Sequence, residues 1–320
     1  SQIYYLKPGH YLTRKGEFPY FSLNPNNLHK TSIDILIGGI RKRFDEAVRK
    51  MVDTSLPICV YFSGGIDSAA VLATARKYHQ NVTAITFGLN SGLDRIIAKK
   101  YCQENNIPLI IAEPPDIKQL APKFVEIAET FEPNIVRHMV GNYAVSKVAH
   151  DNGFRIALVG EASDEIFCGY GVFKEVENGL VTRISKILLS DLHRTQLQRV
   201  DRAAMYWTVE TRVPFLDVDL VNFALGLPNE YKVRQTEKGP IDKWIFRMAM
   251  TDRLPFYITD RAKLPFCTGA GLDTDSSSGT FHKIAEETIS DSILEKYKRL
   301  YPEYSLSTKE EVMNFIIFEK

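Results

Sequence analysis

The residues best suited to chemistry are grouped in one short loop after the first strongly apolar segment of the chain. Residues 63–68 read Ser-Gly-Gly-Ile-Asp-Ser and precede an alanine-rich helical stretch. Gly64 and Gly65 permit backbone angles closed to other residues, so consecutive N–H groups can point into one concavity at the positive end of a helix. The hydroxyl groups of Ser63 and Ser68 add donors. The loop therefore predicts a phosphate-binding site.

Asp67 does not suit a phosphate site alone, because a carboxylate repels phosphates. It fits as a ligand of a magnesium ion that bridges to the phosphates. The structural alternative is a tight turn with Asp67 as the helix cap. The loop lacks the GxxxxGK[ST] pattern of a Walker P-loop. We therefore expect a nucleotide and magnesium at a phosphate loop of another type.

A second acidic cluster follows a later apolar segment, residues 155–159. Residues 160–165 read Gly-Glu-Ala-Ser-Asp-Glu. The structural alternative is a helix start with Ser163 as N-cap and acids in the first turn. Three carboxylates within five residues at the tip of a buried strand are costly without a cation. We therefore expect Asp164 to be a second magnesium ligand, opposite Asp67.

Alternating strands and helices must position both loops. This alternation predicts an α/β fold with a doubly wound parallel sheet of about five strands, which binds ligands at the carboxyl ends of its strands. From about residue 170 the pattern is mostly helical. We expect strands at 56–62, 82–87, 109–112 and 155–159, and helices at 32–52, 67–79, 94–105, 117–131 and 140–152. The predicted domains are an N-terminal arm (1–27), an α/β core (28–200) and a helical C-terminal part that completes the substrate site (201–320).

Composition excludes several classes of protein. The chain has 320 residues, with 40 Lys and Arg against 39 Asp and Glu, so bulk charge indicates no nucleic-acid partner. Its apolar stretches are far shorter than the ~20 residues of a membrane helix. The N-terminus resembles neither a signal nor a transit peptide. Four cysteines without a CxxC pair favour a reducing, cytoplasmic setting.

Several motifs resemble one enzyme family. Residues 63–68 match the SGGxDS loop (PP-loop) of the ATP pyrophosphatases, and residues 160–170 resemble the GEGSDE(I/L)FGGY segment of asparagine synthetases. Further matches follow in the family's order at residues 136–143, 201–205, 210–217, 243–247 and 261–266. The chain thus resembles the C-terminal synthetase domain of glutamine-hydrolysing asparagine synthetases. Residues 6–12 look like the strand that closes the family's glutaminase domain, which is otherwise missing from the sequence.

The resemblance implies a carbon–nitrogen ligase with an adenine nucleotide alpha hydrolase-like fold. Such an enzyme splits ATP to AMP and pyrophosphate, adenylates a carboxylate and transfers it to ammonia or an amine. The resemblance implies that pyrophosphate is bound by Ser63, Gly64, Gly65 and Ser68, and that the adenine and ribose lie in a pocket at Val60, Phe87 and Gly160. It implies magnesium ligation by Asp67 and Asp164. It also implies that Lys263 and Arg137 stabilise charge near the α-phosphate or acyl group, and that Glu161 orients or deprotonates the nucleophile.

Departures from the family pattern keep the substrates open. Leu264 stands where asparagine synthetases have an acid, and Ala162 and Cys168 stand where they have glycine. A β-lactam-synthetase-like cyclase is therefore an alternative. The aromatic arm at residues 1–21 favours a further alternative, the synthetase subunit of a split amidotransferase with a separate glutaminase or a homo-oligomer partner. A non-catalytic nucleotide-binding protein is the third alternative.

Overall fold

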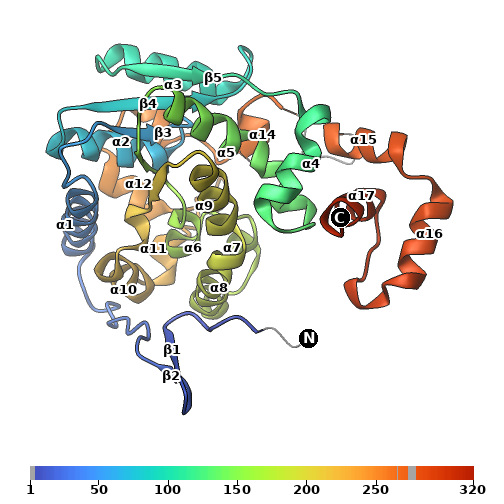
Figure 1. Cartoon of the computed structure of the whole chain (residues 1–320). Helices are drawn as coiled ribbons and strands as arrows, with labels where there is room; N and C mark the ends of the chain where they lie inside the picture. Colours follow the sequence, from blue (N-terminus) through green and yellow to red (C-terminus); the bar gives the residue numbers. More distant parts are fainter. Residues whose placement is uncertain (1–3, 265, 273–278) are drawn as a thin grey trace. The chain divides into compact units, whose positions relative to one another are not determined.

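The computed structural model describes residues 4–264, 266–272 and 279–320. The chain forms two compact units that alternate along the sequence (Figure 1). We call residues 48–161, 193–214 and 250–320 the sheet unit, and residues up to 47, 162–192 and 215–249 the helical unit. The predicted domain boundaries at residues 27 and 200 stay predictions.

The sheet unit is built on five parallel strands in the order β5-β4-β3-β6-β7. From β3 the chain adds β4 and β5 on one side, then returns to add β6 and β7 on the other, so the strand order reverses between β3 and β6. This confirms the predicted doubly wound α/β fold. The strands are β3 (Ile58–Tyr61), β4 (Val82–Phe87), β5 (Leu109–Ala112), β6 (Ile156–Leu158) and β7 (Glu210–Arg212).

The central strand β3 has apolar residues that are buried on both faces of the sheet. Side chains alternate between faces along a strand. Cys59 belongs to the large core cluster that includes α4 and α5 residues, while Ile58 and Val60 point to the opposite face. All three side chains are fully buried. Burial on both faces is typical of a parallel sheet covered by crossover helices.

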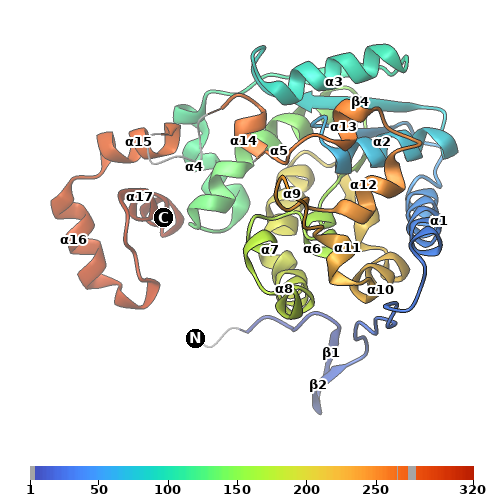
Figure 2. The ribbon, with the colours of Figure 1, turned by 180° about the vertical axis from the view of Figure 1, so that it is seen from behind.

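The helices of the sheet unit that the sequence predicted one by one are α2 (Ile66–Tyr78), α3 (Leu93–Glu104), α4 (Ile117–Ala128) and α5 (Pro133–Asp151). The other helices described in this unit, for which the sequence predicted only a mostly helical region, are α9 (Gln196–Tyr206), α13 (Phe256–Thr259), α14 (Phe266–Gly269), α15 (Thr280–Thr288), α16 (Asp291–Leu300) and α17 (Lys309–Phe318). Helix α5 begins seven residues before the predicted start at Val140, because Pro133 suits a first helical turn. Helices α15 and α17 pack against α4, and α16 packs against α17 on the side away from α4 (Figure 2).

The helical unit packs around a group of phenylalanines, and its chain after residue 170 is mostly helical, as predicted. The Phe167 and Phe246 rings stack with centroids 4.8 Å apart, and Phe44 and Phe215 lie 4.9 Å apart in the same group. The unit contains α6 (Ser163–Phe167), α7 (Val172–Glu175), α8 (Asn178–Asp191), α10 (Val218–Gly226) and α11 (Asn229–Lys232), and α1 (Ile33–Met51) and α12 (Trp244–Met250) begin in it.

The described part of the N-terminal arm contains two short strands. Strands β1 (His10–Thr13) and β2 (Gly16–Pro19) form an antiparallel hairpin in which Tyr11 stacks on Phe18. Tyr5 is 91% exposed. Two short strands are too few to form a hydrophobic core, so a hairpin of this kind is only marginally stable by itself and leaves aromatic side chains exposed.

Two compositional expectations concern the whole chain. Among the described residues, none of the helices combines the length and the apolar character needed to cross a bilayer. In the same part of the chain, Cys59, Cys102 and Cys168 are free, buried thiols.

Candidate functional site

The phosphate loop leaves the carboxyl end of β3 and enters α2. Gly64 has φ +73°, in the left-handed region that favours glycine. A side chain at Gly64 would also collide with Ile97. Gly65 is the N-cap of α2 with φ −79°, which any residue adopts. The predicted need for glycine is therefore confirmed at Gly64 and wrong at Gly65.

The two serines of the loop brace its backbone. Ser63 N–H donates to Ser68 Oγ at 3.2 Å, and Ser68 Oγ donates to the Gly65 carbonyl at 3.2 Å. The two hydroxyl groups also lie 3.2 Å apart. Ser63 and Ser68 thus share a hydrogen-bond network that closes the loop around the start of α2.

The loop that follows β6 packs directly against the phosphate loop. A Cβ added to Gly160 would lie 3.1 Å from Ser68 N and 3.2 Å from Asp67 Cβ. The sequence predicted both loops, and the sheet register brings them together, because β3 and β6 are parallel neighbours. Ligands of doubly wound sheets bind where strand order reverses, which is the position of these two loops.

Asp67 lies in the first turn of α2 beside a lysine from a distant segment. Lys263 Nζ is 4.0 Å from Asp67 Oδ2, and the two side chains are 38% and 14% exposed. The N-cap position of α2 belongs to Gly65, so the alternative of Asp67 as the cap is wrong. The structure therefore brings together two of the predicted site residues, one acidic and one basic.

The residues predicted for the adenine pocket and the nucleophile lie at neighbouring strand ends. Phe87 ends β4 with 4% of its surface exposed, and Val60 is fully buried within β3. Glu161 is half-buried after β6. Burial raises the pKa of Tyr61, and the nearby Glu161 adds to that rise. Glu161 therefore lies near the carboxyl end of β3.

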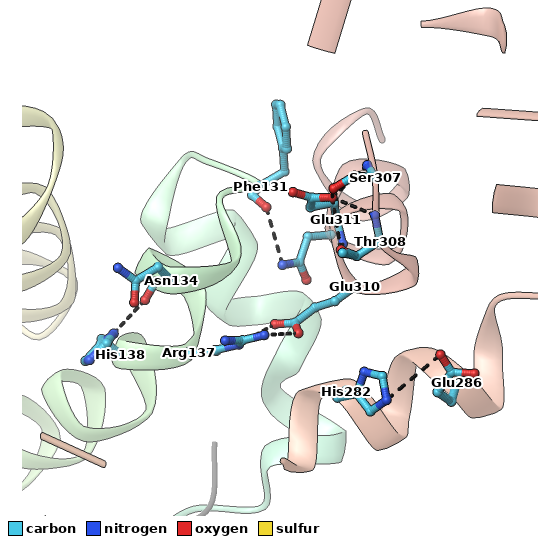
Figure 3. Close-up of polar contacts among 11 residues, drawn as sticks. Phe131, Asn134, Arg137, His138, His282, Glu286, Ser307, Thr308, Glu310 and Glu311 are labelled. Atoms are coloured by element: carbon cyan, nitrogen blue, oxygen red, sulfur yellow. Dashed lines mark hydrogen bonds and ion pairs between the residues drawn. The ribbon is translucent and has the colours of Figure 1, made fainter. Parts of the chain in front are cut away.

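Arg137 on α5 faces the C-terminal helices of the sheet unit (Figure 3). Its Nε and Nη2 donate to the two carboxylate oxygens of Glu310, at 2.8 and 2.5 Å. Glu310 is 3% exposed in this pair and lies in the first turn of α17. The predicted anion-binding guanidinium thus already holds one carboxylate. The sequence carries no local pattern that links these two residues.

Asp164 belongs to the helical unit, where the structure supplies a cation that the sequence did not predict. Lys243 Nζ lies 2.7 Å from Asp164 Oδ1 and 3.2 Å from Ser163 Oγ, and its side chain is 1% exposed. Lys243 has φ +50°, an uncommon value for a lysine. Lys243 is the first residue of the matched segment 243–247, and this is the feature of the sequence that could have indicated a cation near Asp164.

Two residues near Asp164 explain the glycines of the family pattern. Ala162 has φ +71° and Cys168 has φ +64°, so both occupy the left-handed region. At both positions the resembling motif has a glycine, which this chain has replaced. This chain therefore keeps the left-handed backbone at both positions with residues other than glycine, which are less stable in that conformation.

The side-chain chemistry of the two predicted ligands suits a magnesium ion that arrives with a nucleotide. The two predicted ligands, Asp67 and Asp164, offer hard carboxylate oxygens, the donors that magnesium prefers. In the described part of the chain, no group of three or more His, Cys, Asp or Glu residues could hold a metal. Magnesium commonly binds through one or two carboxylates and completes its shell with phosphates and water.

Comparisons with known proteins identify the family of the chain. A family model described as asparagine synthase matches residues 39–181 and 177–312. The chain is 27% identical to a glutamine-hydrolysing asparagine synthetase of Sandersonia aurantiaca and 28% identical to one of Triphysaria versicolor. These alignments cover 99% and 98% of this chain but 63% and 56% of the relatives, so the chain spans about three-fifths of their length.

Among solved structures, an NH3-dependent NAD synthetase from Campylobacter jejuni is similar over 52% of this chain and 78% of its own, with 16% identity and a TM-score of 0.29. The family model, by contrast, covers most of the chain, including both predicted loops and the segment that carries Lys263. This chain therefore belongs to the asparagine synthase family.

Proposed function

We propose that this chain is an ATP-dependent, AMP-forming synthetase that adenylates a carboxylate and transfers the acyl group to ammonia or an amine. The observation that carries the proposal is the contact between the two loops, with Gly160 packed on Asp67 and Ser68 where the strand order reverses. Membership of the asparagine synthase family supports the same chemistry.

The first step would make the carboxylate reactive. A carboxylate is a poor electrophile, because two oxygens share its charge. One of these oxygens would attack the α-phosphorus of ATP, breaking the bond to the bridging oxygen and releasing pyrophosphate. In this proposal Ser63, Gly64, Gly65 and Ser68 hold the pyrophosphate, and Val60, Phe87 and Gly160 border the adenine and ribose.

Charged side chains would stabilise the transition state and guide the second substrate. Lys263, already beside Asp67, would balance negative charge near the α-phosphate or the acyl group. Arg137, proposed for the same role, would first have to leave its pair with Glu310. Glu161 would orient or deprotonate the amine that displaces AMP and forms the amide. Asp67 and Asp164 would hold magnesium, which when bound neutralises charge on the pyrophosphate.

The acid substrate is proposed only as a class. Leu264 is apolar where the resembling enzymes have an acid, so the group next to Lys263 carries no charge. A carboxylate other than aspartate, or one that bears its own amine and closes to a lactam, is compatible with this replacement.

The decisive experiment follows carboxylate-dependent exchange of labelled pyrophosphate into ATP with a panel of amino acids and magnesium. Wild-type protein should show exchange and AMP formation, whereas Asp67→Ala should lower exchange by at least about 100-fold. Equal circular dichroism spectra would show that the variant is folded. No exchange with any acid, together with magnesium-dependent ATP binding by calorimetry, would favour a non-catalytic nucleotide-binding protein.

A second proposal concerns the nitrogen source. Tyr4, Tyr5 and Tyr20 of the arm are 79%, 91% and 71% exposed, a large aromatic surface for two short strands. We propose that a glutaminase domain or subunit covers this surface and supplies ammonia. Purification from a cell lysate should then retain a glutaminase and give glutamine-dependent amide formation. Equal activity of the isolated chain with ammonia and with glutamine would contradict this.

A further inference from the structure

Lys263 lies in a segment without regular secondary structure. Residues 261–264 connect α13 to α14 and belong to no helix or strand. The main-chain hydrogen bonds of a helix or sheet therefore do not set the position of the Lys263 ammonium, which is 4.0 Å from Asp67 Oδ2. A functional cation on such a segment needs support from other residues to keep a productive geometry.

The side chain two residues before Lys263 makes this connection. Arg261 Nη2 donates to Asp94 Oδ1 at 2.5 Å, and these side chains are 10% and 9% exposed. Arg261 Nη1 also lies 3.5 Å from the main-chain carbonyl of Ser63, the first residue of the phosphate loop. One guanidinium therefore links the lysine segment, the phosphate loop and a buried carboxylate.

Asp94 is a buried and closely packed point of attachment. It lies in the first turn of α3, and Gly269 has no room for a side chain because the Asp94 carboxylate fills that space. The main-chain carbonyl of Asp94 lies 3.2 Å from where a Cβ of Gly64 would be. Burial raises the pKa of Asp94, and the hydrogen bond from Arg261 opposes that rise. Asp94 thus touches the phosphate loop through its backbone and Arg261 through its carboxylate.

We propose that Arg261 is a positioning residue, which holds Lys263 and the phosphate loop in register by bridging Asp94 and the Ser63 carbonyl. The inference rests on the proposed function of Lys263. The guanidinium matches two acceptors at once because its donors form a fixed planar fork, which a lysine ammonium does not provide. Arg261→Lys should therefore keep only part of the function that Arg261→Gln loses.

The first test needs no ligand. Hydrogen exchange of peptides that contain residues 62–68 and 260–264 should be roughly tenfold faster in Arg261→Gln than in wild type, because the two segments lose their common anchor. Arg212→Gln is the matched control, since Arg212 also bridges a carboxylate, Glu210, and a main-chain carbonyl, that of Met51. If both variants exchange alike in these peptides, the proposal is overturned.

The second test asks whether Arg261 acts through Lys263. Calorimetry would measure binding of α,β-methylene-ATP with magnesium to Arg261→Gln, Lys263→Met and the double variant. We expect Lys263→Met to weaken binding about 100-fold in wild type but less than about threefold in the Arg261→Gln background. Partial rescue by Arg261→Lys is also expected. Equal losses in both backgrounds would overturn the coupling.

The two tests separate this inference from the proposed function. A wild-type chain that fails to bind the analogue would contradict the proposed function, while the exchange data would still decide whether Arg261 anchors the loop. A chain that adenylates normally after Arg261→Gln, with unchanged hydrogen exchange, would overturn the positioning role and leave the proposed function standing.

Discussion

The ammonium of Lys243 lies 2.7 Å from Oδ1 of Asp164, and 1% and 13% of these two side chains are exposed. The acidic segment at residues 161–165 therefore has a cation of its own within the helical unit. Lys243 holds it from a strained backbone position, φ +50°. A magnesium ion at Asp164 would have to compete with this ammonium for the carboxylate.

Removing Lys243 should expose the cost of a buried carboxylate that has lost a neighbouring cation. Lys243→Met is expected to lower the free energy of unfolding by about 3–5 kcal/mol, since Asp164 would lose the ammonium 2.7 Å from its Oδ1. Adding Asp164→Asn should recover part of this loss. Urea denaturation of the two single variants and the double variant measures both effects, and strictly additive losses would contradict a direct pair.

Substitution of Gly160 tests the contact between the two loops. Gly160→Ala places a methyl group 3.1 Å from Ser68 N, so the phosphate loop must shift, and we expect ATP–pyrophosphate exchange to fall at least about tenfold. Gly179→Ala is the control, because a Cβ there meets nothing within 4 Å. Exchange that is unaffected by Gly160→Ala would mean that the contact does not matter for nucleotide binding.

Relief of backbone strain is expected at Ala162. Its φ of +71° disfavours alanine, and its small side chain contributes little packing. Ala162→Gly should therefore raise the free energy of unfolding by roughly 0.5–1 kcal/mol. Thermal unfolding measures this change. Ala224→Gly, inside helix α10, should do the opposite, and a loss of stability at both positions would refute the strain.

Lys232 predicts a stability that depends on pH. Its side chain is fully buried, and within the described residues its Nζ has no hydrogen-bond partner. Burial lowers the pKa of Lys232 from 10.5 to about 8, so the folded state binds this proton less tightly than the unfolded state. The cost of folding is full below pH 8, shrinks as the pH rises and disappears above 10.5.

Lys232→Met should remove that cost. At pH 7 the variant is expected to be more stable by roughly 3 kcal/mol, the equivalent of the pKa shift, and the gain should shrink between pH 8 and 10.5. Urea denaturation at several pH values measures it. A gain that stays constant with pH would show that packing, and not the charge, is responsible.

The ion pair between Arg137 and Glu310 should stabilise the folded sheet unit. Glu310→Gln leaves a half-buried guanidinium with a weaker partner, and we expect a loss of about 2–4 kcal/mol in the free energy of unfolding. Glu286→Gln is the control, since its ion pair with Lys309 is exposed on the Glu286 side and should contribute less than about 1 kcal/mol. Equal losses would contradict the effect of burial.

Local patterns in the sequence predicted the turn at residues 63–68, the four named strands and the positions of helices α1 to α5. These features depend on neighbouring residues: apolar runs for buried strands, and Gly64 for a left-handed turn. Strand β7 was not predicted, because Glu-Thr-Arg has no apolar pattern and forms a strand only by pairing with β6.

Only the tertiary structure decided which charges meet. Asp94 and Arg261 are 167 residues apart, and Arg137 and Glu310 are 173 apart, so no local spacing connects them. The sequence indicates that such side chains are charged, and burial then strongly favours a partner of opposite charge. Which partner it finds is set by the packing of whole helices and strands, because that packing alone brings distant segments within hydrogen-bond distance.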